Sequence, residues 1–535
     1  MVSTDEMLHM HENGRFFTAT PPPGGQVRSI AEFEPNQGVI ISYKNQFGLP
    51  VNLIAEMSQG AIVYTIVPNQ TTQNQVSSYY ASNGVNMQNC LFVQASIDSY
   101  WSRDYSPWFI ADSTNHVAIV DFPYNRPRPN DDNIPVVMAN YLNMDLYGMN
   151  LEHTGGNYMA DGLGIAASTD LVASENASLS LSQINQYVND YLGIHTYHLL
   201  DDPLGDYIEH VDCWGKFLAV DKVLIGEVPS SDPRFQDYEV VADFFKNQNC
   251  SYGYPYKVFR SFSPNGQPYT NSFILNNKVF VPVVSSFGYP WNDSALAVYQ
   301  RAMPGYDIIG IYPTGSISWY DTDALHCRTH EVPDAGMLYI HHIPYFDTLI
   351  QQTTYPLDVT IIPYSDSALI ADSLRIYYRY NSGGWSSVLL SHDTLHQYTG
   401  VIPDSSGASA ISYYIHATDR SGRSENHPYM GAKDPHEFFI STTGAIVDKS
   451  MSPKRSSLFP NPCDDIAFLK LPGTHEPVVV NIFSFDGKLI FQMTKAAYTE
   501  GEVLRIATGE MAQGIYLIEV KGKSFRENHK LLIVH

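Results

Sequence analysis

The sequence predicts an α/β domain followed by two small all-β domains. Strand-like and helix-like patterns alternate from residue 26 to about residue 350, and beyond that point the helical periodicity disappears. Alternating element types are typical of an α/β domain, whereas short strands separated by turn clusters are typical of β-sandwiches. The length of 535 residues also favours several domains over one.

Three segments carry the α/β prediction. Residues 60–68 (GAIVYTIVP) and 116–124 (HVAIVDFPY) are apolar, β-branched runs that indicate buried strands. Residues 178–194 (SLSLSQINQYVNDYLGI) have the spacing of an amphipathic helix that begins in a Ser/Asn-rich cap region. Because no Pro/Gly/Ser-rich linker interrupts the stretch, we expect one domain over 26–350, preceded by an N-terminal extension, 1–25.

The remaining chain reads as β-structure. Residues 373–381 (SLRIYYRYN) and 410–419 (AISYYIHATD) alternate apolar and polar side chains between turn clusters, which predicts an immunoglobulin-like β-sandwich over 351–440. A Ser/Thr-rich segment, 441–457, is the predicted linker. Beyond it, a strand–Asp-Gly–strand pattern at 478–494 and a strand pair at 514–535 predict a second small β-sandwich over 458–535.

Composition excludes several classes of protein. Apolar residues make up 44% and charged residues 16%, which is typical of a folded chain, and the net charge of −24 opposes binding to nucleic acid or to anionic lipid. No run approaches the length of a membrane span, and the first residues lack the basic and apolar regions of a secretion signal. We therefore expect any such signal to lie outside this chain.

The cysteines exclude a disulfide-stapled scaffold. There are five of them, an odd number, and none has CxxC or zinc-finger spacing. Cys90, Cys250 and Cys463 have no flanking motif, so they are predicted to be packing residues. The stretch 130–133 (NDDN) offers oxygen ligands for a structural calcium or sodium ion, but its spacing is not that of an EF-hand and no metal site is predicted.

Four motifs in the α/β region hold residues that could carry chemistry, and a fifth, shorter one accompanies them. They are 101–108 (WSRDYSPW), 155–162 (GGNYMADG), 207–213 (YIEHVDC), 323–330 (DALHCRTH) and 269–272 (YTNS). Each has an ordinary explanation when taken alone. The first could be a turn with its Arg and Asp paired, the second a simple turn, the third a structural His–Asp pair in an extended segment, and the fourth an inert buried cysteine.

Their order along the chain resembles that of the guanidine-modifying, or pentein, superfamily. The resemblance is closest to the bacterial, calcium-independent peptidylarginine deiminases of the agmatine-deiminase-like branch. It rests on YWSRDYSPWF, YNRPRPNDD, TGGNYMADG, EHVDCWGK, QPYTNSFILNN and ALHCRTHEV. It implies that 26–350 is a five-bladed α/β propeller, a feature that periodicity does not reveal.

The resemblance also implies a reaction, the hydrolysis of a peptidyl-arginine guanidinium to citrulline and ammonia without an organic cofactor. A guanidinium is a planar cation that matches carboxylates, and Asp104 and Asp212 are expected to hold it. Cys327 is expected to attack the guanidinium carbon and form a covalent thiouronium, with His210 as general acid and base. Asn271 is expected to orient the cysteine or its water.

Three alternatives bear on these roles. His326 and His330 are further candidates for the acid and base, although the family pattern favours His210. His210, Asp212 and Cys213 could also be imagined as metal ligands. In a strand, however, adjacent residues point to opposite faces, so that spacing suits a shared ion poorly.

The resemblance further implies a preference for arginine at the C-terminus of a peptide. Arg126 and Arg128, in the Pro-rich segment 125–129, are expected to clamp the terminal carboxylate, and the prolines to stiffen the loop. Trp101, Tyr207 and Ile208 are expected to line the aliphatic stem of the arginine. The alternative for the two arginines is that they are solvated side chains in a Pro-rich loop. The alternative for the other three residues is ordinary core packing.

The last domain has a resemblance of its own. LFPNP at 458–462, DGK at 486–488, GIY at 514–516 and KLLIV at 530–534 resemble the C-terminal sorting domain of type IX secretion in Bacteroidetes. It implies a secreted protein or one attached to the outer-membrane surface, with the type IX secretion machinery as a partner. An ordinary β-sandwich appendage is the alternative.

Three other functions compete with the deimination of C-terminal peptidyl arginine. An agmatine or free-arginine deiminase would use the same reaction, but agmatine has no carboxylate and would leave Arg126 and Arg128 idle. A catalytically inactive surface-binding protein would not need the whole residue set. A papain-like thiol protease would leave Asp104 and Asp212 unexplained.

Overall fold

The computed structural model describes two compact units. They comprise Met1–Ser251 with Pro255–Pro344 and Gln352–Phe439, and Tyr252–Tyr254 with Tyr345–Gln351 and Ile440–His535. The described residues are 4–284, 289–404, 407–441, 456–459, 461, 463, 466–471, 478–484, 488–495, 503–509, 511–522 and 526–534. Most of the predicted linker and the predicted Asp-Gly turn lie outside them. The predicted domain boundaries stay predictions.

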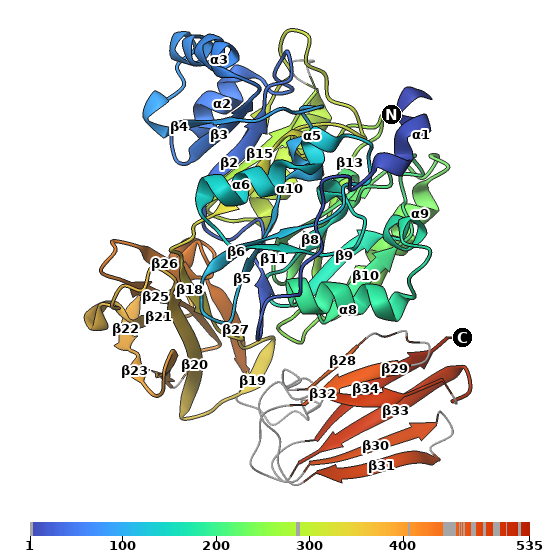
Figure 1. Ribbon diagram of the computed structural model, residues 1–535. Helices are drawn as coiled ribbons and strands as arrows, with labels where there is room; N and C mark the ends of the chain where they lie inside the picture. Colours follow the sequence, from blue (N-terminus) through green and yellow to red (C-terminus); the bar gives the residue numbers. More distant parts are fainter. Residues whose placement is uncertain are drawn as a thin grey trace. The chain divides into compact units, whose positions relative to one another are not determined.

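The α/β region of the first unit is built from five small sheets (Figure 1). The first two sheets contain, in order across the sheet, β1 (Arg28–Ser29), β5 (Trp108–Ala111), β6 (Val117–Asp121) and β7 (Leu146–Gly148), and then β10 (Thr196–Leu200), β9 (Ile165–Thr169) and β8 (Met159–Ala160). The next two contain β11 (Gly215–Ala219), β12 (Lys222–Glu227) and β13 (Lys257–Phe262), and then β14 (Phe273–Leu275), β15 (Lys278–Pro282) and β16 (Asp307–Ile311). The fifth contains β17 (His330–Pro333), β2 (Asn36–Ser42), β3 (Ile62–Val67) and β4 (Cys90–Gln94). The last sheet joins strands from the two ends of the region.

The five sheets repeat one pattern, an antiparallel pair followed by a parallel pair. The antiparallel pairs are β5–β6, β8–β9, β11–β12, β14–β15 and β17–β2. Each parallel pair is connected through a helix, in turn α6 (Ile134–Leu142), α8 (Leu181–Leu192), α9 (Phe235–Asn247), α10 (Pro290–Ala302) and α2 (Val51–Met57), and α3 (Gln70–Ser82) leads to β4. Such crossovers are what parallel strands require.

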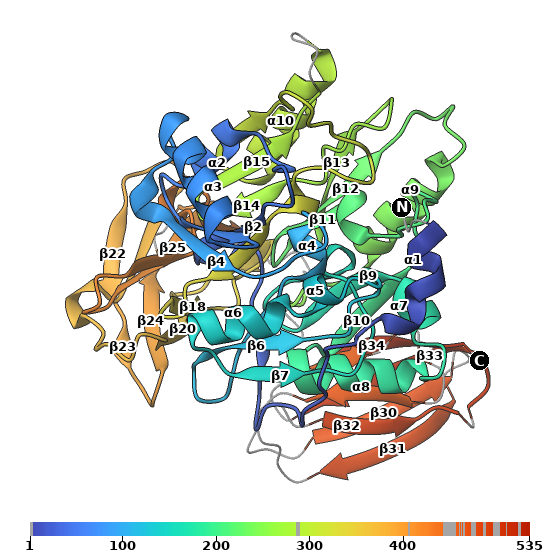
Figure 2. The same cartoon turned by 45° about the horizontal axis from the view of Figure 1, so that its top comes forward.

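The predicted α/β elements are confirmed. Helix α8 begins at a capping box in which Ser180 and Gln183 satisfy each other's backbone amides, and it ends at Gly193, whose φ of 69° suits glycine. Ile184 and Val188 lie on its buried face. Figures 1 and 2 show α3, α8 and α9 on the outside of this region, and Figure 2 shows the short helix α4 (Ser102–Tyr105) in its middle.

The rest of the first unit is antiparallel β-structure, as predicted. One sheet contains β18 (Leu338–His341), β20 (Thr354–Pro363), β24 (Gln397–Pro403) and β23 (Ser391–His392). A second contains β27 (His436–Ser441), β25 (Ala410–Thr418), β21 (Arg375–Tyr380) and β22 (Ser386–Leu389), with β26 (Ser424–His427) beside β25. Alternate residues are buried along much of β21 and β25, as the sequence alternation predicts.

The second unit contains the predicted small all-β domain. One sheet holds β28 (Ser457–Phe459), β29 (Ile466–Lys470) and β32 (Val503–Ala507), and another holds β31 (Leu489–Lys495), β30 (Val478–Ser484), β33 (Gly514–Lys521) and β34 (Arg526–Ile533). All of these pairings are antiparallel. In the described parts of both units, none of the helices has the length and apolar character needed to cross a membrane.

The other helical segments are short. They are α1 (Thr4–His9), η1 (Met10–Glu12), η2 (Met87–Asn89), α5 (Pro129–Asp132), η3 (Gly155–Asn157), α7 (Leu171–Glu175), η4 (Val211–Cys213), η5 (His326–Arg328), η6 (Ala371–Ser373) and η7 (Gly431–Lys433), and the strand β19 (Thr348–Ile350) completes the description. Helix α4 and the turns η4 and η5 hold three of the predicted site residues, Asp104, Asp212 and Cys327.

Candidate active site

The predicted site motifs lie at equivalent positions in the five sheets. Asp104, Asn157, Asp212, Asn271 and Cys327 fall just before β5, β8, β11, β14 and β17, which are the strands that form the antiparallel pairs. Four of the five residues belong to one-turn helices, α4, η3, η4 and η5. A repeated pattern therefore places one polar residue from each sheet in a common region.

Cys327 is surrounded by predicted partners. The Asn271 Nδ2 amide lies 3.3 Å from Cys327 Sγ, and Asp212 Oδ2 lies 3.7 Å from it. Asn271 Oδ1 also accepts hydrogen bonds from the backbone amides of His326, at 2.9 Å, and Cys327, at 3.4 Å. Asn271 thus holds both the thiol and its turn, which is the placement predicted for it.

The expectation that His210 and Asp212 share an extended segment is wrong. His210 is extended, but Val211–Cys213 form the 3-10 turn η4, so the side-chain alternation of a strand does not apply. As a result, Asp212 meets thiols on both sides, because Cys213 Sγ lies 3.5 Å from its Oδ1. The argument that separated Cys213 from Asp212 on opposite faces is therefore also wrong.

The Gly-Gly-Asn turn allows Asp104 and His210 to approach each other. His210 Nδ1 lies 3.7 Å from Asp104 Oδ1. A Cβ on Gly156 would lie 2.5 Å from His210 Nδ1 and 2.9 Å from Asp104 Oδ1, so a side chain at this position would displace both. Asn157 Oδ1 accepts hydrogen bonds from the amides of Thr169 and Val211 and so fixes η4.

Two buried atoms of this pair lack hydrogen-bond partners. Within the described part of the chain, Asp104 Oδ1 and His210 Nε2 are both enclosed and make no hydrogen bond. Buried polar atoms are rarely left in this state, and each needs an explanation. A carboxylate oxygen and a ring nitrogen without hydrogen-bond partners are suited to a ligand that brings N–H groups.

The electrostatics of the site follow from its burial. Burial, reinforced by the charge of Asp212, raises the pKa of Asp104 to about 7. Burial, together with the nearby Arg126, lowers the pKa of His210 to about 3. A hydrogen bond from Cys213 lowers the pKa of Cys327, but burial and the neighbouring carboxylates outweigh it, so the pKa is raised. These shifts favour the neutral thiol of Cys327 and the neutral imidazole of His210 near pH 7.

The two arginines of the predicted clamp are not solvated. Only 12% of the Arg126 side chain and 11% of the Arg128 side chain are exposed, which disfavours the alternative of two solvated arginines. Their positive charges lower the pKa of Asp104, against its burial, so they lie within electrostatic reach of the site. Asn125, which is buried, donates to Glu175 at 2.7 Å and anchors the loop.

A carboxylate of the same chain already binds Arg128. Arg128 Nε donates to Glu6 Oε1 of helix α1 at 2.7 Å, and the guanidinium lies 4.9 Å from the centre of the Trp101 ring. Arg126 Nη1 lies 3.9 Å from Glu175 Oε1 and donates to the Asn125 carbonyl at 2.9 Å.

The residues predicted to line the substrate stem lie at or near the surface. Tyr207 is 50% exposed, and Trp101 and Ile208 are half-buried. The Trp101 ring packs beside Tyr100 and under Arg128. Core packing therefore does not account for Tyr207, and the lining role of all three stays a prediction.

The other candidate histidines have different surroundings. His326 lies between two carboxylates, with Nδ1 2.6 Å from Asp212 Oδ2 and Nε2 2.8 Å from Glu32 Oε2. His330 Nδ1 contacts the carbonyl of Glu331 at 2.9 Å, and burial lowers its pKa to about 4. Neither arrangement leaves the histidine directed at Asp104, as His210 is.

The carboxylate oxygens of the acidic stretch 130–133 accept hydrogen bonds from backbone amides. Asp131 accepts from the amides of Asp98 and Ser99, and Asp132 from those of Tyr124 and Phe16. Among the described residues, no group of three or more His, Cys, Asp or Glu side chains is arranged to hold a metal ion. These carboxylates shape the loop that carries Arg126 and Arg128.

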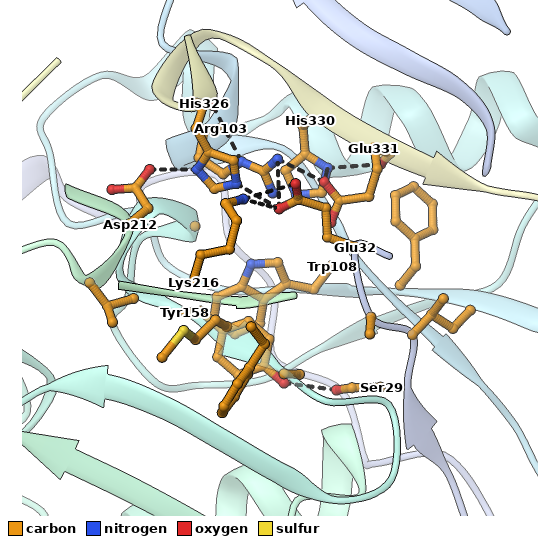
Figure 3. A pocket seen from close by; sticks show the side chains of 18 of the residues that line it. Ser29, Glu32, Arg103, Trp108, Tyr158, Asp212, Lys216, His326, His330 and Glu331 are labelled. Atoms are coloured by element: carbon orange, nitrogen blue, oxygen red, sulfur yellow. Dashed lines mark hydrogen bonds and ion pairs between the residues drawn. The ribbon is translucent and has the colours of Figure 1, made fainter. Parts of the chain in front are cut away.

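Sequence reasoning missed a buried charged cluster behind Asp212. Figure 3 shows a pocket in which Asp212, His326, Glu32 and Lys216 form a chain, with Arg103 and Glu331 beside it. Arg103 pairs with Glu331 at 2.7 Å, which corrects the simple alternative that Arg103 and Asp104 form a pair. A lysine inside the apolar strand GKFLA was the available signal, because a charge is rarely buried unless it is paired.

A second missed group supports the turn of the nucleophile. Arg328, which follows Cys327 directly, makes two hydrogen bonds of 2.8 Å to Asp323 and one of 2.6 Å to the Gly48 carbonyl. Its guanidinium also lies over the rings of Tyr100 and Trp319. A buried bidentate pair of this kind holds the η5 turn rigidly.

Comparison with known families assigns the fold to a class, the deiminases of the pentein type. Residues 28–333 match the model of the Porphyromonas-type peptidyl-arginine deiminase family, and since this is more than half of the chain, the protein belongs to that family. Residues 457–534 match the secretion system C-terminal sorting domain, so the protein is secreted or attached to the cell surface. As predicted, enzymes of this kind require no cofactor.

Similar proteins agree with the class. A putative agmatine deiminase of Legionella pneumophila is 26% identical over 280 residues, which cover 48% of this chain and 79% of the relative. An agmatine deiminase of Pseudomonas putida is 24% identical and covers 47% and 79%. A solved structure of a putative arginine deiminase from Porphyromonas gingivalis has 19% identity and a TM-score of 0.51, covering 58% of this chain and 99% of that one.

Proposed function

We propose that the protein hydrolyses the guanidinium of peptidyl arginine, preferentially at a C-terminus, to citrulline and ammonia. The observation that carries this proposal is the convergence of Cys327, Asp212, Asp104 and His210, with Asp104 Oδ1 and His210 Nε2 left without partners among the described residues. A guanidinium supplies what these groups lack, namely several N–H donors and a positive charge between two carboxylates.

The first half of the reaction forms a thiouronium. Cys327 loses its proton to the neutral His210 ring, and the thiolate forms a bond to the guanidinium carbon. The substrate cation favours the thiolate over the thiol, offsetting the raised pKa of Cys327. The C–N bond to one terminal amine then breaks, and the imidazolium donates its proton so that ammonia leaves.

The second half returns the enzyme to its starting state. Neutral His210 accepts a proton from water as the water oxygen attacks the thiouronium carbon. The C–S bond breaks, Cys327 leaves as the thiolate, and it recovers the proton from His210. The ureido oxygen loses its remaining proton, which the released ammonia takes up as ammonium. Arginine thus becomes citrulline, and Asn271 keeps the thiol in place throughout.

Arg126 and Arg128 support the preference for a C-terminal carboxylate. Two buried cations beside a cation-binding site repel the substrate guanidinium unless an anion sits between them. Arg128 binds a carboxylate in this structure, that of Glu6, which indicates the chemistry its environment accepts. In this proposal Trp101, Tyr207 and Ile208 line the methylene stem.

Deimination of agmatine or free arginine is the second candidate. It is favoured by the names of the two curated relatives. Agmatine has no carboxylate and gives the arginine pair nothing to bind.

Four substrates separate the candidates. Citrulline or ureido product and ammonia are measured with a peptide ending in arginine, the same peptide as its amide, free arginine and agmatine, with Cys327→Ala as control. We expect turnover of the acid peptide to exceed that of the amide. Equal rates on the two peptides contradict the clamp, and a wild-type activity that persists in Cys327→Ala, or no activity at all, contradicts the mechanism.

The same proposal extends to the remaining parts of the chain. We interpret the five repeated sheets as the blades of the predicted five-bladed propeller, with Asp104, Asn157, Asp212, Asn271 and Cys327 at equivalent blade ends. We interpret 351–440 as immunoglobulin-like and the sorting domain as the segment bound by the type IX secretion machinery. Small-angle scattering and export assays of chains lacking 458–535 test these assignments.

A further inference from the structure

The Asp212 carboxylate lies at the end of a buried chain of charged groups (Figure 3). Asp212 Oδ2 contacts His326 Nδ1 at 2.6 Å, and His326 Nε2 contacts Glu32 Oε2 at 2.8 Å. Lys216 Nζ donates to both oxygens of Glu32, at 2.7 and 2.8 Å. The side chains of Asp212, His326 and Lys216 are almost fully buried, and that of Glu32 is 14% exposed.

Glu32 is held from several elements. Besides Lys216 of β11, the backbone amide of Ile274 in β14 donates to Glu32 Oε1 at 2.7 Å, and Arg103 of α4 lies 3.9 Å from Oε2. The Lys216 ammonium, the Ile274 amide and the Arg103 guanidinium therefore hold Glu32 in place. Glu32 thus anchors the row of charged groups, and its contact with His326 Nε2 restrains the imidazole ring.

The His326 ring meets a carboxylate at each nitrogen. A neutral imidazole carries one N–H, so at least one of the two contacts needs a second proton, either on the ring or on a carboxyl group. Short, charged hydrogen bonds of this kind are directional. They fix the plane of the ring, and the ring in turn fixes the Asp212 carboxylate that faces Cys327.

We propose that His326 is a positioning residue that sets the orientation of Asp212 through its Nδ1, with Glu32 and Lys216 as its support. The inference rests on the proposed function, because it deepens the role of Asp212 in holding the guanidinium. In this proposal the His326 ring acts on the reaction through its contact with Asp212.

Two amide substitutions distinguish the nitrogens of the ring. The Asn amide nitrogen replaces Nδ1, and the Gln amide nitrogen replaces Nε2. His326→Asn therefore keeps the donor to Asp212, whereas His326→Gln keeps only the contact with Glu32. We expect kcat on an arginine-terminated peptide to fall on the order of 100-fold in His326→Gln and less than roughly 10-fold in His326→Asn. Equal losses, or the reverse order, overturn the proposal.

A paired variant serves as a matched control. Glu32→Gln with Lys216→Met removes the support and leaves no unpaired charge, and it preserves the donor to Asp212. It is expected to resemble His326→Asn. A loss as large as that of His326→Gln contradicts a role centred on the Asp212 contact.

Alkylation of Cys327 provides a readout without turnover. Chloroacetamidine is a cation that needs Asp212 and Asp104, whereas iodoacetamide is neutral. We expect the ratio of their alkylation rates to fall in His326→Gln and to be retained in His326→Asn. An unchanged ratio overturns the positioning role even if the wild-type chain deiminates nothing, and iodoacetamide reactivity in every variant verifies the fold around the thiol.

A different observation supports a second inference, at the predicted clamp. Glu6 and Arg128 are bonded at 2.7 Å, and the Glu6 side chain is 21% exposed. The segment after α1 is fixed to the α/β region, since Asn13 donates to Glu152 at 2.8 Å and the Phe16 amide donates to Asp132 at 3.3 Å. The N-terminal extension therefore delivers a carboxylate to the loop that carries Arg128.

We infer that Glu6 is a specificity-determining residue that competes with a ligand carboxylate for Arg128. The inference depends on the proposed clamp. Replacing Glu6 by Gln leaves Arg128 without a charged partner from α1, so a substrate carboxylate binds without displacing one. We expect Glu6→Gln to lower KM for a peptide ending in arginine by roughly two- to five-fold and to leave KM for its amide unchanged.

Glu12→Gln is the matched control, because Glu12 lies in the same extension but bonds to His9 and Arg15. It is expected to change neither KM. If Glu6→Gln changes KM equally for the arginine-terminated peptide and its amide, or changes neither, this inference alone is overturned. A wild-type enzyme with equal KM values for acid and amide overturns the clamp and this inference together.

Discussion

The two carboxylates assigned to the guanidinium have opposite surroundings. Asp212 contacts His326, Cys213 and Cys327, and the chain behind it extends to Lys216. Asp104 lies beside His210, and its Oδ1 has no hydrogen-bond partner within the described residues. The hydrogen bonds of Asp212 are therefore made within the protein, whereas Asp104 Oδ1 is left able to accept one. This difference supports the proposal that a ligand binds on the Asp104 side of the site.

Matched amide substitutions sharpen this comparison most. Asp212→Asn removes the partner of a buried imidazole and is expected to cost about 3–5 kcal/mol of stability. Asp104→Asn removes a buried carboxylate whose Oδ1 has no hydrogen-bond partner among the described residues, so its stability is expected to equal or exceed that of the wild type. Both are expected to lower kcat/KM by at least roughly 100-fold. Denaturant unfolding and steady-state kinetics measure the two effects, and equal stability losses contradict the comparison.

The clamp should affect binding more than chemistry. Arg126→Gln with Arg128→Gln is expected to raise KM for a peptide ending in arginine by roughly 10- to 100-fold, because two charge-assisted contacts are lost. KM for the corresponding amide should change little. Steady-state kinetics on both peptides test this, and a uniform fall in kcat would instead place the arginines in the chemical step.

The pH dependence follows from the raised pKa of Asp104, about 7. Because the ionised form binds the guanidinium, kcat/KM is expected to fall about ten-fold per pH unit below 7. The folded pKa lies above the unfolded value of about 3.9, so the contribution of Asp104 to stability is present below that value and is lost as the pH rises toward 7.

The control for this pH effect is Asp104→Asn. Its stability advantage over the wild type should grow between about pH 4 and pH 7 and then level off. His210 should add no limb to kcat/KM between pH 5 and 8, since its pKa is lowered to about 3. A stability difference that does not vary with pH would place the Asp104 carboxyl in an ordinary, solvated state.

The smallest expected effect concerns Cys213. Its hydrogen bond lowers the pKa of Cys327, so Cys213→Ala should raise the pH midpoint of Cys327 alkylation and slow turnover by roughly two- to five-fold. Cys213→Ser keeps an O–H donor, so its pH midpoint of alkylation and its turnover rate should lie between those of the wild type and those of Cys213→Ala. Iodoacetamide alkylation across pH measures the shift, and an alanine variant identical to wild type contradicts the coupling.

Much of the fold was accessible from the sequence. The capped helix α8 and the alternating strands β21 and β25 follow from spacing, because one face of each is buried. The site residues were predicted by resemblance, since their order along the chain is characteristic. The extended conformation expected around Asp212 was wrong, because a one-turn 3-10 helix has no periodic signature.

The remaining features depend on long-range packing. Glu32 and Lys216 are 184 residues apart, and Glu6 and Arg128 are 122 residues apart. A lone charge in a sequence gives no indication of its partner, because an ion pair forms wherever the fold brings opposite charges together in a buried site.

Local patterning determined the α/β region and the two β-rich regions, and the resemblance of its motifs to a known family indicated the family. Only the tertiary structure decided that Asp212 is held and that Asp104 Oδ1 has no hydrogen-bond partner among the described residues. The physical reason is that periodicity records which face of an element is buried, whereas hydrogen-bond satisfaction depends on atoms from different sheets that meet only in the folded chain.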